Sequence, residues 1–198
     1  RVRAAGVGPK RAAMAARQLV TEEVHALVSF GVAGALQPSL QPGMLLLPSV
    51  VRNTEGEELG VDACWHARAV TRLGQVEQGA IVQVDTIVRL PADKARLGAQ
   101  SDAVAVDMES LAVARVAAEC GVPCLVVRAV ADAADMMLPR FISADGRYSL
   151  PGALLNCLAN PFDVPELLRL GRAYRRARTA LAPVAREIIV DGLGGDWG

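Results

Sequence analysis

The chain has 198 residues, and its 21 lysine and arginine residues balance 21 aspartate and glutamate residues, so its formal net charge is zero. A neutral chain with 4% aromatic residues lacks the basic surface and stacking rings typical of nucleic-acid-binding proteins. Hydrophobic residues make up 52% of it, which excludes a disordered chain, and no apolar run reaches the roughly 20 residues of a membrane-spanning helix. We therefore expect a soluble globular domain.

Cysteine and histidine usage argues against a metal site. The four cysteines are Cys64, Cys120, Cys124 and Cys157. None of them form a CxxC pair, and the two histidines are His25 and His66, so we expect no metal and no cofactor. Free thiols fit a reducing cytoplasm. We expect no signal peptide, because residues 1–6 lack a charged start followed by an apolar stretch, and the natural start can lie upstream because the chain does not begin with Met.

Short apolar runs alternate with helical stretches along residues 1–160. The runs of strand length cover residues 27–32, 44–51, 80–84, 104–106 and 124–130. Such continuous runs are typical of strands that are buried on both faces. We predict an α/β fold, a three-layer αβα domain with a central mixed, mostly parallel sheet.

Two segments between the strands have helical periodicity. In residues 10–20 we expect Met14 and Leu19 to pack on the core. Residues 109–120 place four small apolar side chains on one helix face, namely Ala112, Val113, Val116 and Ala117.

Residues 161–190 are predicted to form a C-terminal amphipathic helical extension of the same domain. The apolar residues expected to pack are Leu167, Leu168, Leu170, Tyr174 and Leu181. The arginines of the segment are Arg169, Arg172, Arg175, Arg176 and Arg178, and no acid occurs between Glu166 and Glu187. This pattern fits a solvated basic face on a packed helix, or a basic surface that rests on anionic lipid.

Acidic residues follow three of the predicted strands. They are Asp85, then Asp107 and Glu109, then Asp132 and Asp135. In open α/β sheets ligands bind beyond the carboxyl ends of strands. A single acid there is typical of a helix cap, but three such ends predict a site at one sheet edge. Two glycine segments, Gly6-Val7-Gly8-Pro9 and Gly31-Val32-Ala33-Gly34, would let a ligand approach the backbone.

These segments together resemble the nucleoside phosphorylase and nucleosidase superfamily. Ala105-Val106-Asp107-Met108-Glu109-Ser110 and Val127-Arg128-Ala129-Val130-Ala131-Asp132-Ala133-Ala134-Asp135 are similar to its paired signatures, V-E-M-E-[SA] and R-[AV]-[IV]-S-D-x-A-D. The two glycine segments resemble the other two glycine segments of that family, in the same order. Leu138-Pro139, Asp145-Gly146-Arg147 and the arginine-rich tail are most similar to the hopanoid-associated phosphorylases, which are thought to remove adenine from adenosylhopane.

The resemblance implies a role for each matched residue. Asp132 would be the general acid that protonates the leaving purine, Glu109 and Met108 would bind the ribose, and Ile87 and Val88 would enclose the base. Ala33 and Gly34 would line the site of the attacking water or phosphate. A lipophilic 5′ group would contact Met136, Met137, Leu138 and Phe141. Each position also has a structural interpretation: Met108 as a core residue, Glu109 as an acid at a helix start, and Asp135 as a cap.

The chain departs from the family pattern at three positions. Asp107 replaces a longer Glu, Val32 replaces a polar residue, and Ala131 replaces a Ser that orients the acid. We therefore expect Asp132 to depend on backbone donors or water. We expect the family's upstream strand, which carries the glutamate that activates water in nucleosidases, to be missing from this sequence. Phosphorolysis and hydrolysis therefore both stay open.

We predict cleavage of the N-glycosidic bond of an adenosine-type nucleoside with a lipophilic 5′ group, with release of adenine in hopanoid biosynthesis. The alternatives are a methylthioadenosine/adenosylhomocysteine nucleosidase, a futalosine hydrolase and an inactive nucleoside-binding module. The expected partners are a nucleoside substrate, which is lipid-linked in the first of these functions, and phosphate, but no nucleic acid. The resemblance implies a homodimer or larger homo-oligomer. We expect the protein in the cytoplasm, with peripheral membrane contact through the arginine-rich helix as a further expectation.

Overall fold

The computed structural model describes residues 1–139 and 164–193, and within them seven strands form one mixed sheet. The strands are β1 (Leu27–Ala35), β2 (Leu45–Leu46), β3 (Val50–Arg52), β4 (Glu58–Gly60), β5 (Ile81–Gln83), β6 (Ala105–Asp107) and β7 (Cys124–Asp132). Their order across the sheet is β2-β7-β1-β6-β5-β3-β4. The apolar run 44–51 gives two short strands instead of the single predicted one, because Pro48 lies between them and cannot donate to a sheet ladder.

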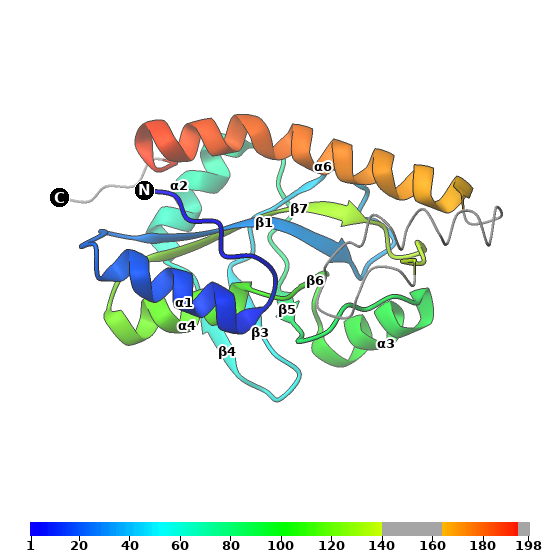
Figure 1. Cartoon of the computed structure of the whole chain (residues 1–198), viewed down its shortest axis with the longest axis horizontal. Coiled ribbons are helices and arrows are strands. Elements are labelled where there is room, and N and C mark those ends of the chain that lie inside the picture. The colour runs from blue at the N-terminus through cyan, green and yellow to red at the C-terminus, as the bar shows by residue number, and fades with distance from the viewer. Residues whose placement is uncertain (140–163, 194–198) are drawn as a thin grey trace.

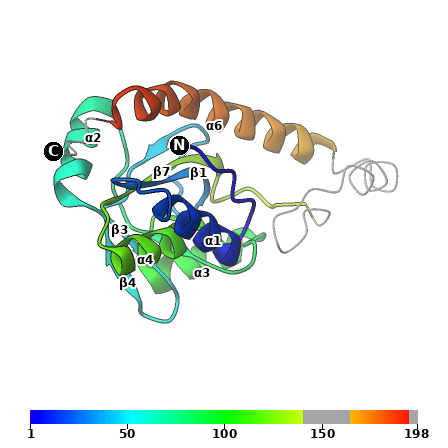
Figure 2. The same cartoon turned by 60° about the vertical axis from the view of Figure 1, so that its left-hand side comes forward.

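Helices cover both faces of the sheet. They are α1 (Pro9–Val20), α2 (Ala63–Leu73), α3 (Pro91–Ser101), α4 (Ser110–Cys120) and α6 (Val164–Asp191). Figure 1 shows α6 lying along one face, while α1 and α4 run side by side across the other, and Figure 2 shows the same layers after a turn. The predicted three-layer α/β fold with a C-terminal helix is confirmed. None of the helices in the described ranges is long and apolar enough to cross a bilayer.

Strand directions decide which strand ends meet. β1 is parallel to β7, and β5 is parallel to both β3 and β6, whereas the β1–β6, β2–β7 and β3–β4 pairs are antiparallel. Because β6 runs against β1 and β7, its carboxyl end points away from that of β7. Asp107 and Asp132 are therefore not at the ends of parallel strands, as the prediction of one shared sheet edge assumed. The register still places Val106 and Asp132 opposite the same residue, Gly34.

The core lies on both sides of the central strands. Between the sheet and α1 and α4, Ala12 and Ala16 pack with Leu111 and Val116. All four residues predicted on one face of α4 are buried. Met14 is 63% exposed, so its predicted packing is wrong, because the small side chains of Ala12 and Ala16 form the contact face of α1 instead.

On the other side, α6 packs against β7 through a stripe of small and aliphatic residues. The buried members are Ala173, Ala177, Leu181 and Val184, which recur at helical spacing. Leu168 and Tyr174 are 54% and 39% exposed, so the prediction that they pack on the core is wrong for these two residues. Alanine at the contact brings the helix close to the sheet and turns its larger side chains toward solvent.

Local signals explain where several helices begin and end. Pro9 begins α1, where a missing N–H has no consequence. Asp62 caps α2 by accepting a hydrogen bond from the Trp65 backbone N–H at 2.7 Å. Gly121 ends α4 in the left-handed conformation, with φ of 67°. The Trp65 indole N–H then donates to the Gly192 carbonyl at 2.7 Å, which ties α2 to the end of α6.

Candidate active site

Asp132 ends β7 and lies against a glycine of the neighbouring strand. The β1–β7 register shifts between Ala33 and Gly34, so Ala33 pairs with Val130 and Gly34 with Asp132. Ala131 is therefore the extra residue of a β-bulge, a feature that redirects the side chain after it. A Cβ atom at Gly34 would lie 3.1 Å from Asp132 Oδ2 and 3.2 Å from Oδ1, so the carboxylate occupies the space that glycine leaves open.

A buried lysine holds the Asp132 carboxylate. Lys94 of α3 has no exposed surface, and its Nζ lies 2.5 Å from Asp132 Oδ2. The same Nζ donates to the Ala133 carbonyl at 2.8 Å and to the Met136 carbonyl at 2.9 Å. The expectation that Asp132 depends on backbone donors or water is thus wrong, because a side chain from another helix fills that role.

Burial raises the pKa of the Asp132 carboxyl above its ordinary value, although the nearby Lys94 ammonium lowers that pKa in part. The Asp132 side chain is 10% exposed, so little water reaches its charged form. A carboxyl with a raised pKa can carry a proton closer to neutrality than a surface aspartate. That is the property required of a general acid.

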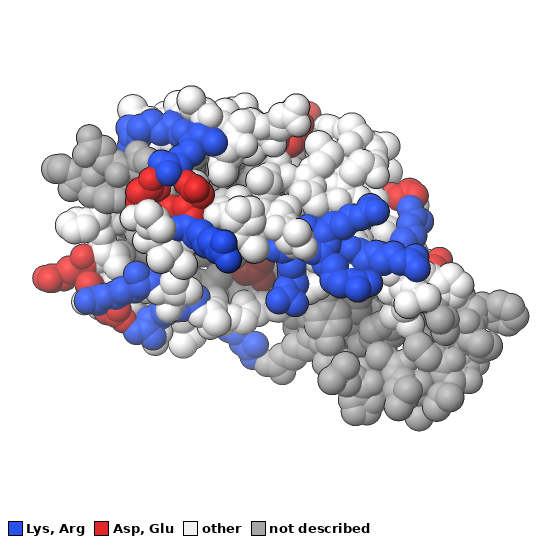
Figure 3. Space-filling model, turned by 90° about the horizontal axis from the view of Figure 1, so that it is seen from above, with Lys and Arg blue, Asp and Glu red and all other residues white. Residues whose placement is uncertain are grey.

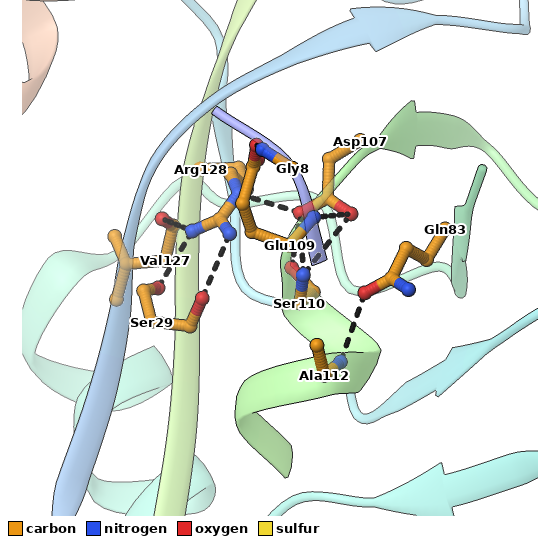
Figure 4. A network of polar contacts seen from close by, with 9 residues as sticks. All are labelled: Gly8, Ser29, Gln83, Asp107, Glu109, Ser110, Ala112, Val127 and Arg128. Atoms are coloured by element: carbon orange, nitrogen blue, oxygen red, sulfur yellow. Dashed lines mark hydrogen bonds and ion pairs between the residues drawn. The ribbon is translucent and has the colours of Figure 1, made fainter. Parts of the chain in front are cut away.

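A second buried ion pair fixes the start of α4 (Figure 4). Arg128 Nε lies 2.8 Å from Asp107 Oδ2, with side chains 2% and 1% exposed. The guanidinium also donates to the Ser29 carbonyl at 2.7 Å and the Ser29 Oγ at 2.8 Å. Asp107 in turn accepts from the Ser110 backbone N–H at 3.2 Å and from the Ser110 hydroxyl. Asp107 is therefore a structural acid that caps the helix.

Glu109 lies between this network and the first glycine segment. Its Oε1 accepts a hydrogen bond from the Gly8 backbone N–H at 2.7 Å, and its own N–H donates to Asp107 Oδ1 at 3.3 Å. Burial raises the pKa of Glu109, and the Asp107 carboxylate adds to the rise, while the Gly8 N–H and the Arg128 guanidinium oppose it. Gly8 precedes α1, so the Glu109 carboxylate lies at the start of that helix, a position that favours an anion.

The other predicted site residues differ in their exposure. Ala33 is buried in the core beside Gly34, and Met108 is 9% exposed. Val88 is partly buried against the cluster that contains Val82 and Leu97, and Ile87 is half-buried. Asp85, the acid that follows β5, is exposed.

The segment that follows Asp132 is partly described. Met136 and Leu138 are buried, and Met136 packs with Ala133 and with Ala173 of α6. Met137 is 43% exposed. Phe141 lies outside the described residues. In the parts of the chain that the structure describes, no three His, Cys, Asp or Glu side chains gather as a metal site would require.

Comparison with known proteins places this arrangement in a family. A model described as the phosphorylase superfamily matches residues 2–144, which include both glycine segments, Glu109 and Asp132. The chain belongs to the phosphorylase superfamily.

Solved structures of other proteins share the fold. Futalosine hydrolase of Helicobacter pylori is 23% identical with a TM-score of 0.62, and the match covers 66% of this chain and 65% of that one. The 5′-methylthioadenosine/S-adenosylhomocysteine nucleosidase of the same organism is 19% identical with a TM-score of 0.66, covering 92% and 78% of the two chains. The corresponding Neisseria meningitidis nucleosidase, in complex with methylthio-immucillin-A, is 25% identical with a TM-score of 0.62, covering 66% and 67%. This phosphorylase-superfamily chain therefore spans about two thirds of the length of the futalosine hydrolase that it matches.

Two basic residues of this superfamily member were missed by the sequence reasoning. Lys94 lies in α3, a helix that was not predicted, so nothing in the sequence pointed its side chain at Asp132. Arg128 lies within an apolar run. An arginine in the middle of a buried strand could have indicated a buried ion pair, because such a charge needs a buried partner.

Proposed function

We propose that this chain cleaves the N-glycosidic bond of a purine nucleoside, with Asp132 as the general acid. The observation that carries the proposal is the buried Asp132 carboxyl, whose raised pKa and position beside Gly34 suit it to give a proton to a bound base. A purine leaves the ribosyl carbon poorly as an anion. Protonation at its N7 by Asp132 lowers that barrier as the bond to the sugar breaks.

In this proposal Glu109 binds the ribose. Its carboxylate accepts hydrogen bonds from the sugar hydroxyls in place of the Gly8 N–H, or together with it, while positive charge builds on the sugar. Met108 packs against the ribose, and Ile87 and Val88 enclose the base. Water or phosphate attacks the sugar from the side of Ala33 and Gly34.

We further propose a substrate with a lipophilic 5′ group, of the adenosylhopane type. Met136, Met137 and Leu138 directly follow the acid, and flexible or bulky apolar side chains suit a large apolar substituent. The use of such a substrate would make this a cytoplasmic enzyme of hopanoid biosynthesis that works at a membrane surface.

The basic face of α6 supports contact with an anionic membrane. Arg172, Arg175 and Arg176 line an open groove of about 670 Å³ together with Pro42, Gly43 and Met44. Figure 3 looks down on this face and shows one group of basic side chains gathered on it, while other basic side chains of the face lie beside acidic ones. Exposed arginines beside partly exposed apolar residues, such as Met44 and Tyr174, are typical of peripheral membrane surfaces.

The direct test is the rate of adenine release from adenosylhopane and from methylthioadenosine at matched concentrations. Faster release from the lipid-linked nucleoside is expected. A preference for methylthioadenosine would replace this proposal with the nucleosidase alternative, which the names of the similar structures favour. Release from futalosine would favour the hydrolase alternative, and purine binding without turnover would favour the inactive binding module.

We also propose that the chain forms a homodimer or larger homo-oligomer. Exposed apolar side chains on different elements, such as Met14 at 63% and Phe30 at 40%, offer surface for such contacts. Analytical ultracentrifugation that gave a monomer at micromolar concentration would contradict this.

A further inference from the structure

Lys94 is an unusual residue in this chain. Only two of its 21 basic residues are lysines, Lys10 and Lys94. Lys10 is exposed, whereas Lys94 has no exposed surface and lies within α3. A buried ammonium group is unfavourable unless every N–H has a partner. Lys94 meets that condition, because its three donors reach three oxygens.

The three oxygens belong to one segment. Asp132 Oδ2, the Ala133 carbonyl and the Met136 carbonyl lie 2.5, 2.8 and 2.9 Å from Nζ. A point-like ammonium suits three oxygens that converge on one atom, whereas the planar fork of an arginine does not. The lysine therefore ties the proposed acid and the turn after it to α3.

A second contact holds the same segment from the other end. The Leu138 backbone N–H donates to the Arg89 carbonyl at 3.0 Å, just before α3 begins. Residues 132–138 are thus attached to the α3 region at both ends. Bonding to Oδ2 leaves Oδ1 as the oxygen of Asp132 that can face a substrate atom.

From this geometry we infer that Lys94 is the positioning residue of the reaction proposed above. It fixes the orientation of Asp132 through Oδ2, sets the pH range in which that acid keeps its proton, and holds the segment that would contact the 5′ group. This inference depends on the proposed function of Asp132. In this inference Lys94 acts through Asp132 and the carbonyls of the segment that follows it.

The charged groups around Asp132 are few enough to make a pH test specific. Lys94 approaches it from α3, and β1 places the uncharged Gly34 against the carboxylate. Asp135, on the same segment, is paired with Arg169 of α6 at 2.8 Å. Within residues 1–139 and 164–193, a change at residue 94 therefore alters the one cation that is paired with Asp132.

The experiment measures kcat and kcat/KM for base release between pH 5 and 10 for the wild-type chain, Lys94→Met, Lys94→Arg and the exposed control Lys10→Met. A general acid is active while protonated, so activity falls as pH rises through its pKa. Lys94 lowers that pKa, so in Lys94→Met the falling limb of the curve of activity against pH moves to higher pH. The same variant reduces kcat about tenfold or more, as expected for a misplaced acid. Lys94→Arg retains the charge and leaves the limb near its wild-type position, but also lowers kcat. Lys10→Met changes neither.

An unmoved limb in Lys94→Met, or wild-type kcat in Lys94→Arg, would overturn the inference. If Lys94→Met does not fold, Lys94→Arg still tests the inference, which predicts a lower kcat with the falling limb near its wild-type position. Failure of the proposed function looks different: the wild-type chain would release no base. In that case a carboxyl ¹³C NMR titration of Asp132, assigned with Asp132→Asn, tests the same contact, and an equal Asp132 pKa in wild type and Lys94→Met would overturn it.

Discussion

Replacement of Arg128 by methionine removes the cation from the most deeply buried ion pair of the site. Arg128 and Asp107 are 2% and 1% exposed at their side chains, and their nearest polar atoms lie 2.8 Å apart. Methionine fills part of the volume without a charge, so the Asp107 carboxylate stays buried with no cation. Removing one partner of such a pair lowers the free energy of unfolding by about 3–5 kcal/mol. Ser29 loses its bonds to the guanidinium as well.

Urea melts of wild type and Arg128→Met measure this loss, which is large beside the roughly 5–15 kcal/mol of a typical domain. Adding Asp107→Asn to Arg128→Met removes the unpaired charge and keeps an oxygen that accepts from the Ser110 N–H. The double variant therefore recovers about half of the loss or more. A loss below about 1 kcal/mol in Arg128→Met, well short of the value for a broken buried pair, would mean that the unpaired Asp107 charge is not what destabilises the fold. A double variant no more stable than Arg128→Met would lead to the same conclusion.

Three further predictions concern Asp132 as the proposed acid, Glu109 as the proposed ribose-binding residue, and the basic helix. Gly34→Ala places a Cβ 3.1 Å from Asp132 Oδ2 and should reduce base release about tenfold by displacing the acid, whereas Gly171→Ala on α6, where nothing lies within 4 Å, should not. Because burial raises the Glu109 pKa, its charged form opposes folding, and stability falls as pH rises from 4.5 through that raised pKa. Asp132, whose pKa burial also raises, contributes a fall of its own, so Glu109→Gln should make the fall between pH 4.5 and 7 smaller in urea melts while it slows base release. A fall as large as in wild type would contradict the assignment. Neutralising Arg172, Arg175 and Arg176 to Gln should weaken sedimentation with phosphatidylglycerol vesicles by about 150-fold, at about 1 kcal/mol per charge. The same change at Lys10, Arg11 and Arg17 of the opposite layer is the control, and equal weakening there would exclude α6 as the contact.

Much of the fold was predictable because its signals are local. Uninterrupted apolar runs marked β1, β5, β6 and β7, and the alanine and valine face of α4 was predicted correctly because a helix must bury one stripe. α2 and α3 were not predicted. Most of the side chains on each of these two helices are polar or exposed, so apolar periodicity was a weak signal there.

The site was predictable only in part. The sequence pattern identified Asp132 and Glu109 as the residues to examine, but their partners depend on tertiary contacts between distant segments. Lys94 is 38 residues from Asp132, and Gly8 is 101 residues from Glu109. The direction of β6 also could not be read from the sequence, because an apolar run of three residues is the same in a parallel or an antiparallel pair.

Protonation of the leaving base by Asp132 can be tested by a single comparison of two chains. Release of adenine from an adenosine derivative with a lipophilic 5′ group is followed for wild type and Asp132→Asn, with and without phosphate. We expect release by wild type and a loss of about 100-fold or more in Asp132→Asn, as for other general acids. Dependence of the wild-type rate on phosphate would identify the nucleophile. Equal rates for the two chains would show that Asp132 is not the acid.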